Sequence, residues 1–274
     1  MPAGTSSAPV RIAIAGLGAI GLKVAESVDA GIPGCALAAV SAQNLAGARE
    51  RLSGLKHPVP VVAIDALEPL ADIVVECAPA HLLAEIIEPF LRAGKKAIVL
   101  SCGALLKHDL LVSVARASGG QIIVPTGALI GLDAVSAAAE GDIRSVHMIT
   151  RKPVKGLVGA PYLVENNIDV ESIKQPLLLF EGTARAAAAG FPANLNVAVA
   201  LSLAGIGPDR TTLEIWADPA LERNIHRIEV DADSARFSMA IENIPSENPR
   251  TGRITALSVI SCLRKMNAPQ RVGS

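Results

Sequence analysis

The first half of the chain alternates short, continuous aliphatic runs with segments of helical periodicity. Continuous runs are typical of strands that are covered on both faces, and helices between such strands make β–α–β units. The strand-like runs span residues 10–15, 36–41, 59–64, 72–77, 96–101 and 121–125, and the helix-like segments span 19–30, 44–54, 80–93 and 107–118. This alternation predicts an α/β domain with a Rossmann-type, doubly wound parallel sheet.

The pattern changes after about residue 130. Strand-like runs occupy residues 143–152, 177–180, 211–217, 224–230 and 235–241, and helical segments occupy 192–206 and 251–266. The last three runs follow one another without a crossover helix, which favours antiparallel or mixed pairing. We therefore predict two domains: residues 1–130 with the parallel sheet, and residues 131–249 as an α+β domain with an open mixed sheet.

The composition narrows the classes of function. Half of the 274 residues are hydrophobic, only 2% are aromatic, and the formal net charge is −1. This apolar fraction supports a sizeable core and excludes a disordered chain. Nucleic-acid-binding proteins usually carry a basic patch and aromatic side chains that stack on bases, so we expect no nucleic-acid partner.

Cysteine spacing and the N-terminal segment indicate a compartment. Cys35, Cys77, Cys102 and Cys262 form no Cys-x-x-Cys pair, so we expect free thiols and no metal site. The first nine residues lack the basic and apolar regions of a signal peptide, which predicts a cytoplasmic protein. The uncharged segment 186–208 is interrupted by Gly190 and Pro192, which favours a buried helix over a membrane span.

The most informative motif is a Gly-x-Gly-x-x-Gly sequence directly after the first strand. Gly16 would allow a tight turn, Gly18 would let a pyrophosphate approach the backbone, and Gly21 would let the following helix pack closely on the strand. Ala19 and Ile20 begin that helix, whose free N–H groups favour bound phosphate. With a strand before it and a helix and second strand after it, the motif predicts dinucleotide binding.

The choice between NAD and NADP stays open at this stage. An acidic residue at the end of the second strand usually binds the ribose 2′-hydroxyl, but this chain has Ser41 there and no acid nearby. Ser41 and Asn44 could bond either ribose, and Arg49 or Arg51 could reach a 2′-phosphate. We therefore expect NAD or NADP as cofactor.

Five histidines are candidates for proton transfer. His57 and His108 lie in polar loop sequences and are expected to be solvated, whereas His147 lies inside a strand and favours a structural role. His81 follows Ala78 and Pro79 at the carboxyl end of the fourth strand, where cofactors bind, so all three are candidate cofactor contacts. His226 alternates with apolar residues on one strand face, a pattern that fits a structural and a catalytic histidine equally well.

Basic residues provide candidates for anion binding. Arg151 and Lys152 lie near a strand end, and Thr251 lies in the sequence Asn-Pro-Arg-Thr-Gly before the last helix. Solvated surface is the commoner role of any single cation. Two of them beside a cleft would suit a dicarboxylate, for which Arg151, Lys152 and Thr251 are our candidates.

The chain resembles the L-aspartate dehydrogenases along nearly its whole length. The resemblance is carried by Gly16-Leu17-Gly18-Ala19-Ile20-Gly21, Gly127-Ala128-Leu129-Ile130-Gly131-Leu132-Asp133, Thr150-Arg151-Lys152-Pro153, Phe191-Pro192-Ala193-Asn194-Leu195-Asn196-Val197-Ala198, Ala217-Asp218-Pro219, Asn224-Ile225-His226 and Asn248-Pro249-Arg250-Thr251-Gly252. One departure is Val154, where the family pattern has a second proline.

The resemblance implies an activity, a site and an assembly. The activity is NAD(P)-dependent oxidative deamination of L-aspartate to iminoaspartate, which gives oxaloacetate and ammonia or passes to NAD biosynthesis. The catalytic histidine of the family falls on His226, and two cofactor contacts fall on Ala128 and Asn196. The family fold returns a C-terminal helix, here 250–274, to the first domain, and its members form homodimers or larger homo-oligomers.

Two other functions are compatible with the motifs. One is a related two-domain NAD(P)-dependent reductase of a semialdehyde or cyclic imine. The other is a nucleotide-sensing protein without turnover, which the presence of His226 together with the Asn-Pro-Arg-Thr-Gly sequence disfavours.

Overall fold

The structure is a computed structural model, and it describes residues 8–192, 195–246 and 251–273. The chain divides into two compact units, which we describe separately. The first unit consists of Met1–Pro125 and Ala256–Val272, and the second consists of Thr126–Thr255 and Gly273–Ser274.

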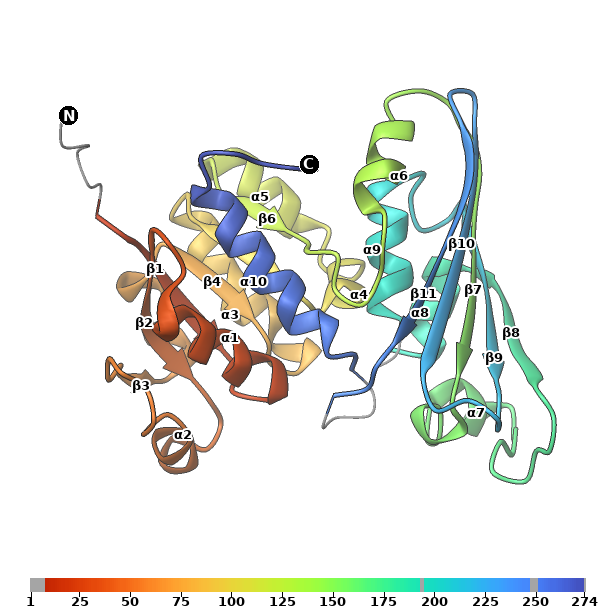
Figure 1. Ribbon diagram of the computed structural model, residues 1–274, viewed down its shortest axis with the longest axis horizontal. Helices are drawn as coiled ribbons and strands as arrows, with labels where there is room; N and C mark the ends of the chain where they lie inside the picture. Colours follow the sequence, from red (N-terminus) through yellow and green to blue (C-terminus); the bar gives the residue numbers. More distant parts are fainter. Residues whose placement is uncertain (1–7, 193–194, 247–250, 274) are drawn as a thin grey trace. The chain divides into compact units, whose positions relative to one another are not determined.

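The first unit is built on a six-stranded sheet in which every pairing is parallel. Its strands are β1 (Val10–Ala15), β2 (Cys35–Ser41), β3 (Val61–Val62), β4 (Ile73–Glu76), β5 (Lys96–Val99) and β6 (Gln121–Ile123). They lie in the order β3-β2-β1-β4-β5-β6 (Figure 1). Strands β2 and β3 are therefore added on one side of β1, and strands β4 to β6 on the other side. This order is that of the Rossmann fold, which confirms the predicted fold class and places ligands at the carboxyl ends of β1 and β4.

Helices cover both faces of this sheet. The first face is covered by α1 (Ala19–Gly31), α2 (Leu45–Arg51) and α10 (Ile254–Asn267), and the second by α3 (Leu83–Arg92) and α5 (Leu110–Ser118). Alternate residues of β1 point to opposite faces of the sheet. Ile12 and Ile14 pack in the core on the first face, and Ala13 and Ala15 pack in the core on the second. All four are fully buried, as expected for a central parallel strand.

The second unit has a five-stranded mixed sheet in the order β11-β10-β7-β9-β8 (Figure 1). Its strands are β7 (Ile143–Lys152), β8 (Leu177–Thr183), β9 (Thr211–Ala217), β10 (Asn224–Ala232) and β11 (Arg236–Asn243). β7 and β9 are parallel, and the other neighbours are antiparallel, as the sequence predicts.

One face of the second sheet is covered by helices. The helices of this unit are α6 (Leu132–Ala138), α7 (Pro161–Glu165), α8 (Ala184–Gly190) and α9 (Asn196–Ala204). A side chain at Gly205, just after α9, would touch Val135 of α6 and Val146 of β7. Val146, Met148, Ile228 and Val230 are accordingly almost fully buried on this covered face.

Short segments complete the path of the chain. They are the single helical turns α4 (Cys102–Leu105), η1 (Ile64–Ala66), η2 (Glu68–Leu70), η3 (Ala80–Leu82) and η4 (Val154–Gly156). In the described part of the chain, no helix is both long enough and apolar enough to cross a membrane.

Several predicted element boundaries differ from the structure. The predicted strand 59–64 is reduced to β3, beside Pro58 and Pro60, which cannot donate to a sheet. The predicted helix 107–118 begins only at Leu110, and the predicted helix 192–206 only at Asn196, with Ala193 and Asn194 outside the described residues.

The last helix also begins later than its predicted start at residue 251. The backbone N–H of Arg253 donates to the carbonyl of Ile244, and that of Ser246 donates to the carbonyl of Thr251. The residues before α10 therefore pair with the segment that directly follows β11, and α10 begins only at Ile254.

Candidate active site

The glycine motif forms a tight turn between β1 and α1. Gly16 has φ +97°, and a Cβ there would lie 2.6 Å from the carbonyl oxygen of Cys77. A Cβ at Gly21 would lie 1.9 Å from the carbonyl oxygen of Gly16, so the helix packs directly on the turn. Gly18 is exposed and has no atom within 4 Å of such a Cβ. The first and third glycines are therefore sterically required, and the second leaves open space for a phosphate beside the helix N-terminus.

Three strand ends meet at this turn. The N–H of Gly16 donates to the carbonyl of Ser41 at 2.8 Å, and a Cβ on Gly16 would lie 2.7 Å from the nitrogen of Ala78. The predicted contacts Gly16, Ser41 and Ala78 are thus brought together. Pro79 and His81 follow Ala78, and the side chains of both are exposed. Ala19 and Ile20 are the first two residues of α1.

Arg51 also reaches the glycine turn. Its guanidinium Nη1 donates to the carbonyl oxygen of Leu17. A cation is therefore held beside the open space at Gly18. This observation and the lack of an acid at Ser41 make the turn compatible with a phosphorylated ribose as well as an unmodified one.

A buried carboxylate connects two of the strand ends. Glu76, the last residue of β4, is fully buried and accepts hydrogen bonds from Ser101 N at 2.9 Å, Ser101 Oγ at 3.0 Å and Leu100 N at 3.2 Å. The backbone of Ala78 also donates to it. Burial raises the pKa of Glu76, while these hydrogen bonds oppose that shift because they favour the ionised form. Glu76 therefore fixes the segment after β4 to the segment after β5.

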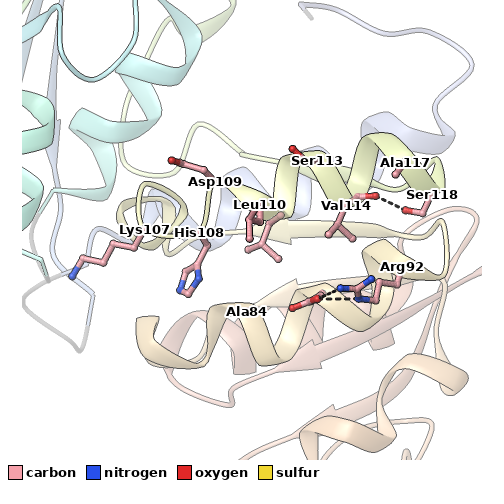
Figure 2. A pocket seen from close by; sticks show the side chains of 12 residues that line it. Ala84, Arg92, Lys107, His108, Asp109, Leu110, Ser113, Val114, Ala117 and Ser118 are labelled. Carbon is pink, nitrogen blue, oxygen red and sulfur yellow. Dashed lines mark hydrogen bonds and ion pairs between the residues drawn. The ribbon is translucent and has the colours of Figure 1, made fainter.

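The first unit also contains a groove of about 770 Å³, which lies apart from the glycine turn. It lies between α3 and α5, with His108, Lys107 and Asp109 at one end and the Glu88–Arg92 ion pair in its wall (Figure 2). None of its lining residues belongs to the glycine turn or to the strand ends around it. We therefore do not assign His108 or this groove to the dinucleotide site.

The covered face of the second sheet is aliphatic along most of its length and polar at one end. At that end, five side chains with 9% exposure or less occupy the ends of three strands: Thr150, Lys152, Asn224, His226 and Asn243. The register pairs His226 with Thr150 of β7 and Asn224 with Asn243 of β11. Buried polar side chains are costly unless they are paired, so such a cluster is typical of a functional site. We refer to these five residues as the polar row.

His226 is the centre of the polar row. Its Nδ1 lies 3.2 Å from Thr150 Oγ1, and only 2% of the residue is exposed. Burial, and to a smaller extent the charge of Lys152, lower the pKa of His226 to about 3. Burial also lowers the pKa of Lys152, to about 8. At neutral pH the arrangement therefore combines a neutral imidazole with a cationic ammonium group.

The other histidines have different surroundings. His57 is largely exposed and pairs with Asp29. His147 lies on the opposite face of β7, with Nδ1 2.9 Å from Thr212 Oγ1 and Nε2 3.5 Å from Glu214. Neither lies in the polar row.

The candidate substrate contacts do not all lie on one face of the sheet. The guanidinium of Arg151 lies over the Trp216 ring, 5.4 Å from its centroid, and 3.8 Å from an oxygen of Asp218. Because side chains alternate along a strand, Arg151 points away from the face that carries Lys152 and His226. Thr251 Oγ1 lies 2.6 Å from Ser246 Oγ, and Asn248, Pro249 and Arg250 lie outside the described residues.

The two family cofactor contacts lie in the second unit. Ala128 is half-buried, and its carbonyl accepts a hydrogen bond of 2.9 Å from Nδ2 of Asn243. Asn196 is the half-buried first residue of α9. Ala128 is therefore joined to the polar row through Asn243.

Comparison with known proteins identifies the family. Residues 133–266 match the family described as aspartate dehydrogenase, C-terminal, and residues 16–125 match the NAD-binding domain of homoserine dehydrogenase. The chain is 62% identical over 270 residues to an L-aspartate dehydrogenase of Bradyrhizobium diazoefficiens, covering 98% of this chain and 96% of that one. The chain belongs to the L-aspartate dehydrogenase family.

Two further relatives agree with this assignment. L-aspartate dehydrogenase 3 of Bordetella bronchiseptica is 58% identical, with 98% of this chain and 100% of that one covered. The crystal structure of aspartate dehydrogenase from Thermotoga maritima is 24% identical and has a TM-score of 0.72, with 96% and 99% of the two chains covered. The latter comparison supports the fold, and the sequence relatives support the membership in the L-aspartate dehydrogenase family.

Sequence reasoning missed two residues in this L-aspartate dehydrogenase family member. Asn243 follows the predicted end of its strand at residue 241, where an asparagine is typical of a turn. Glu76 was included in a predicted strand, but its donors come from Leu100 and Ser101, more than 20 residues away along the chain. An acid inside an otherwise aliphatic run was the only available signal for the second.

Proposed function

We propose that this protein catalyses the NAD(P)-dependent oxidative deamination of L-aspartate and the reverse amination. The balanced reaction converts L-aspartate and NAD(P)⁺ to iminoaspartate, NAD(P)H and a proton, and water then converts the imine to oxaloacetate and ammonia. The observation that carries the proposal is the neutral, buried His226 beside cationic Lys152, in a member of the L-aspartate dehydrogenase family.

The two units have separate tasks in this proposal. The glycine turn and the N-terminus of α1 bind the pyrophosphate, and Gly16, Gly18 and Gly21 provide the required close approach. Ser41, Ala78, Pro79, His81, Ala128 and Asn196 are the remaining proposed cofactor contacts. The bound cofactor supplies one piece of chemistry, the acceptance of hydride from Cα of the amino acid.

His226 acts on protons. A neutral imidazole takes a proton from the amine before hydride leaves, or from the water that attacks the imine carbon. The imidazole is neutral at neutral pH, as a proton acceptor must be, and the Thr150 hydroxyl at Nδ1 fixes the orientation of the ring. A buried position also limits the access of other water to the imine.

Lys152 is the proposed carboxylate contact. A buried ammonium group is destabilised by desolvation, and a carboxylate bound beside it would stabilise the charged form. Thr251 remains a proposed partner for the second carboxylate. For Arg151 the assignment is weaker, because its guanidinium stacks on Trp216 on the opposite face of the sheet.

A direct assay tests the proposed activity. Reduced cofactor should form with L-aspartate and should be consumed with oxaloacetate plus ammonia, each with NAD(H) and with NADP(H). No turnover above background in either direction would defeat the proposal, and turnover of a semialdehyde or cyclic imine alone would support the alternative reductase.

Substitution of His226 tests the mechanism. We expect His226→Ala to lower kcat by a factor of about 10² to 10⁴, the contribution of a positioned general base. His147→Gln, on the opposite face of the same sheet, is the matched control and should retain wild-type kcat. An unchanged kcat in folded His226→Ala would rule out this role.

We further propose that the protein is a cytoplasmic homodimer or a larger homo-oligomer. The support is the face of the second sheet opposite to its helices, where the apolar side chains of Ile149, Trp216 and Ile225 are only partly buried. Apolar groups on an uncovered face favour association. Light scattering coupled to size-exclusion chromatography measures the mass, and a monomer at micromolar concentration would contradict the proposal.

A further inference from the structure

Two buried oxygen atoms have no hydrogen-bond partner in the described part of the chain. They are Thr211 Oγ1 and Asn243 Oδ1. Buried polar atoms are nearly always paired, because an unpaired one loses its hydrogen bonds to water and gains none in return. Each of the two therefore requires an explanation, and their positions in the second sheet differ.

Asn243 lies in the polar row. Only 3% of Asn243 is exposed, and its register partner is Asn224 of β10. Asn224 lies two residues before His226 on β10. Residues two apart on a strand share a face and lie about 7 Å apart, so Asn243 and His226 face the same layer. Thr211 lies at the opposite end of the sheet, six residues before Ala217, the register partner of Lys152.

The orientation of the Asn243 amide is determined by its other half. Nδ2 donates to the carbonyl of Ala128 at 2.9 Å, and a carbonyl cannot donate in return. Oδ1 is therefore the free half of the group, and it is an acceptor. Gly252 lies beside it, and a Cβ at Gly252 would come within 3.1 Å of Oδ1, so a larger residue there would crowd this oxygen.

We propose that Asn243 Oδ1 binds the α-amino nitrogen of the substrate, the nitrogen that the reaction releases. The inference rests on the proposed function. An amino acid with two carboxylates has only one group that can donate to Oδ1, because the ionised carboxylates are acceptors and the amine or iminium nitrogen is a donor. The polar row then divides the substrate by chemistry, with Lys152 on a carboxylate and Asn243 on the nitrogen.

This assignment makes Asn243 a specificity residue for nitrogen. A dicarboxylate without nitrogen leaves Oδ1 unpaired when it binds, whereas L-aspartate satisfies it. Sites built to hydrogen-bond a substrate group reject analogues that lack this group, because the buried partner then stays unsatisfied.

The test compares two ligands on each variant. The probes are L-aspartate and succinate, which has two carboxylates and no nitrogen. Calorimetry measures the Kd of each for enzyme saturated with reduced cofactor, where no turnover occurs. We expect Asn243→Leu, which keeps the side-chain volume, to raise the ratio of the L-aspartate Kd to the succinate Kd by about 10- to 100-fold, the effect of losing a hydrogen bond to a charged group.

A second variant separates the two halves of the amide. Asn243→Asp keeps an acceptor at Oδ1 and replaces only the donor to Ala128, so the ratio should stay at or below its wild-type value. Thr211→Val is the matched control, since it removes an equally unpaired buried oxygen far from the polar row, and its ratio should equal that of the wild type.

Three outcomes overturn the inference. If Asn243→Leu leaves both Kd values unchanged, Asn243 contacts neither ligand and the inference is wrong. Equal weakening of both ligands assigns Asn243 to support of the Ala128 segment alone. Loss of affinity for the reduced cofactor with an unchanged ratio assigns Oδ1 to the cofactor carboxamide instead. Because these measurements need no turnover, they are independent of the assay for the proposed reaction.

Discussion

Thr150 Oγ1 lies 3.2 Å from Nδ1 of His226, and the two residues are register partners on neighbouring antiparallel strands. Both are almost fully buried. The contact therefore fixes the imidazole through sheet geometry, and it leaves Nε2 as the nitrogen available to a ligand.

Replacing Thr150 tests this orienting contact. Thr150→Val keeps the shape and removes the hydroxyl, so we expect kcat to fall by about 10-fold, with a smaller change in the KM for L-aspartate. Thr150→Ser retains the hydroxyl and should recover most of the lost rate. Equal rates for the two variants would show that the hydroxyl does not position His226.

The pKa of Lys152 predicts a pH dependence of dicarboxylate binding. Its pKa is lowered to about 8 by burial, and only the protonated form attracts a carboxylate. The Kd of succinate should therefore rise above pH 8, by up to about tenfold per pH unit. Lys152→Arg should bind without this rise because arginine stays charged. A pH-independent Kd in the wild type would contradict the assignment.

The same shift affects stability with a defined sign. The folded-state pKa of Lys152, about 8, lies below the ordinary value of 10.5, so the unfolded chain binds more protons between these limits. The free energy of unfolding should therefore rise with pH from about 8 to 10.5. Denaturant titrations at several pH values should show this rise in the wild type and not in Lys152→Met.

Substitutions in the glycine turn should affect either stability or cofactor affinity, depending on the position. Gly21→Ala places a Cβ 1.9 Å from the carbonyl of Gly16, so the variant should be strongly destabilised or should not fold. Gly18→Ala meets no protein atom, so its unfolding free energy should stay near the wild-type value. Its Kd for NAD(P)H should rise at least tenfold if Gly18 faces the pyrophosphate. Circular dichroism and cofactor fluorescence measure the two effects.

Glu76 predicts a stability effect beside the cofactor site. Glu76→Gln exchanges one acceptor oxygen for an NH₂ group that faces N–H and O–H donors, and we expect a loss of about 2–4 kcal/mol of unfolding free energy. The exposed Glu85 of α3 provides the control, because Glu85→Gln should change stability by less than about 0.5 kcal/mol. Equal stabilities of the two variants would mean that the buried carboxylate is not needed to hold the strand ends.

The sequence was sufficient for the elements that obey a simple period. The central strands were predicted because their aliphatic runs, such as β1, are buried on both sides, and the glycine motif was predicted because its spacing has a steric cause. The predicted strand 59–64 is too long at its start because Pro60 lies within it and cannot donate a sheet hydrogen bond.

The polar row was only partly predictable. His226 could be placed on a strand face by alternation, but whether that face was covered depended on α6 and α9, which come from other parts of the chain. Asn243 had no local signal, because its role follows from pairing with Asn224 and from the distant Ala128 carbonyl. Long-range contacts of this kind cannot be read from periodicity.

The position of α10 has a consequence for how the protein is made. Val259 and Leu263 of this helix are fully buried in the same core as Ile12 and Val24, although the whole second unit separates them in the chain. A polypeptide that emerges from the ribosome can complete the second unit while the first still lacks part of its hydrophobic layer. The first unit can therefore complete its hydrophobic core only after the second unit has been synthesised.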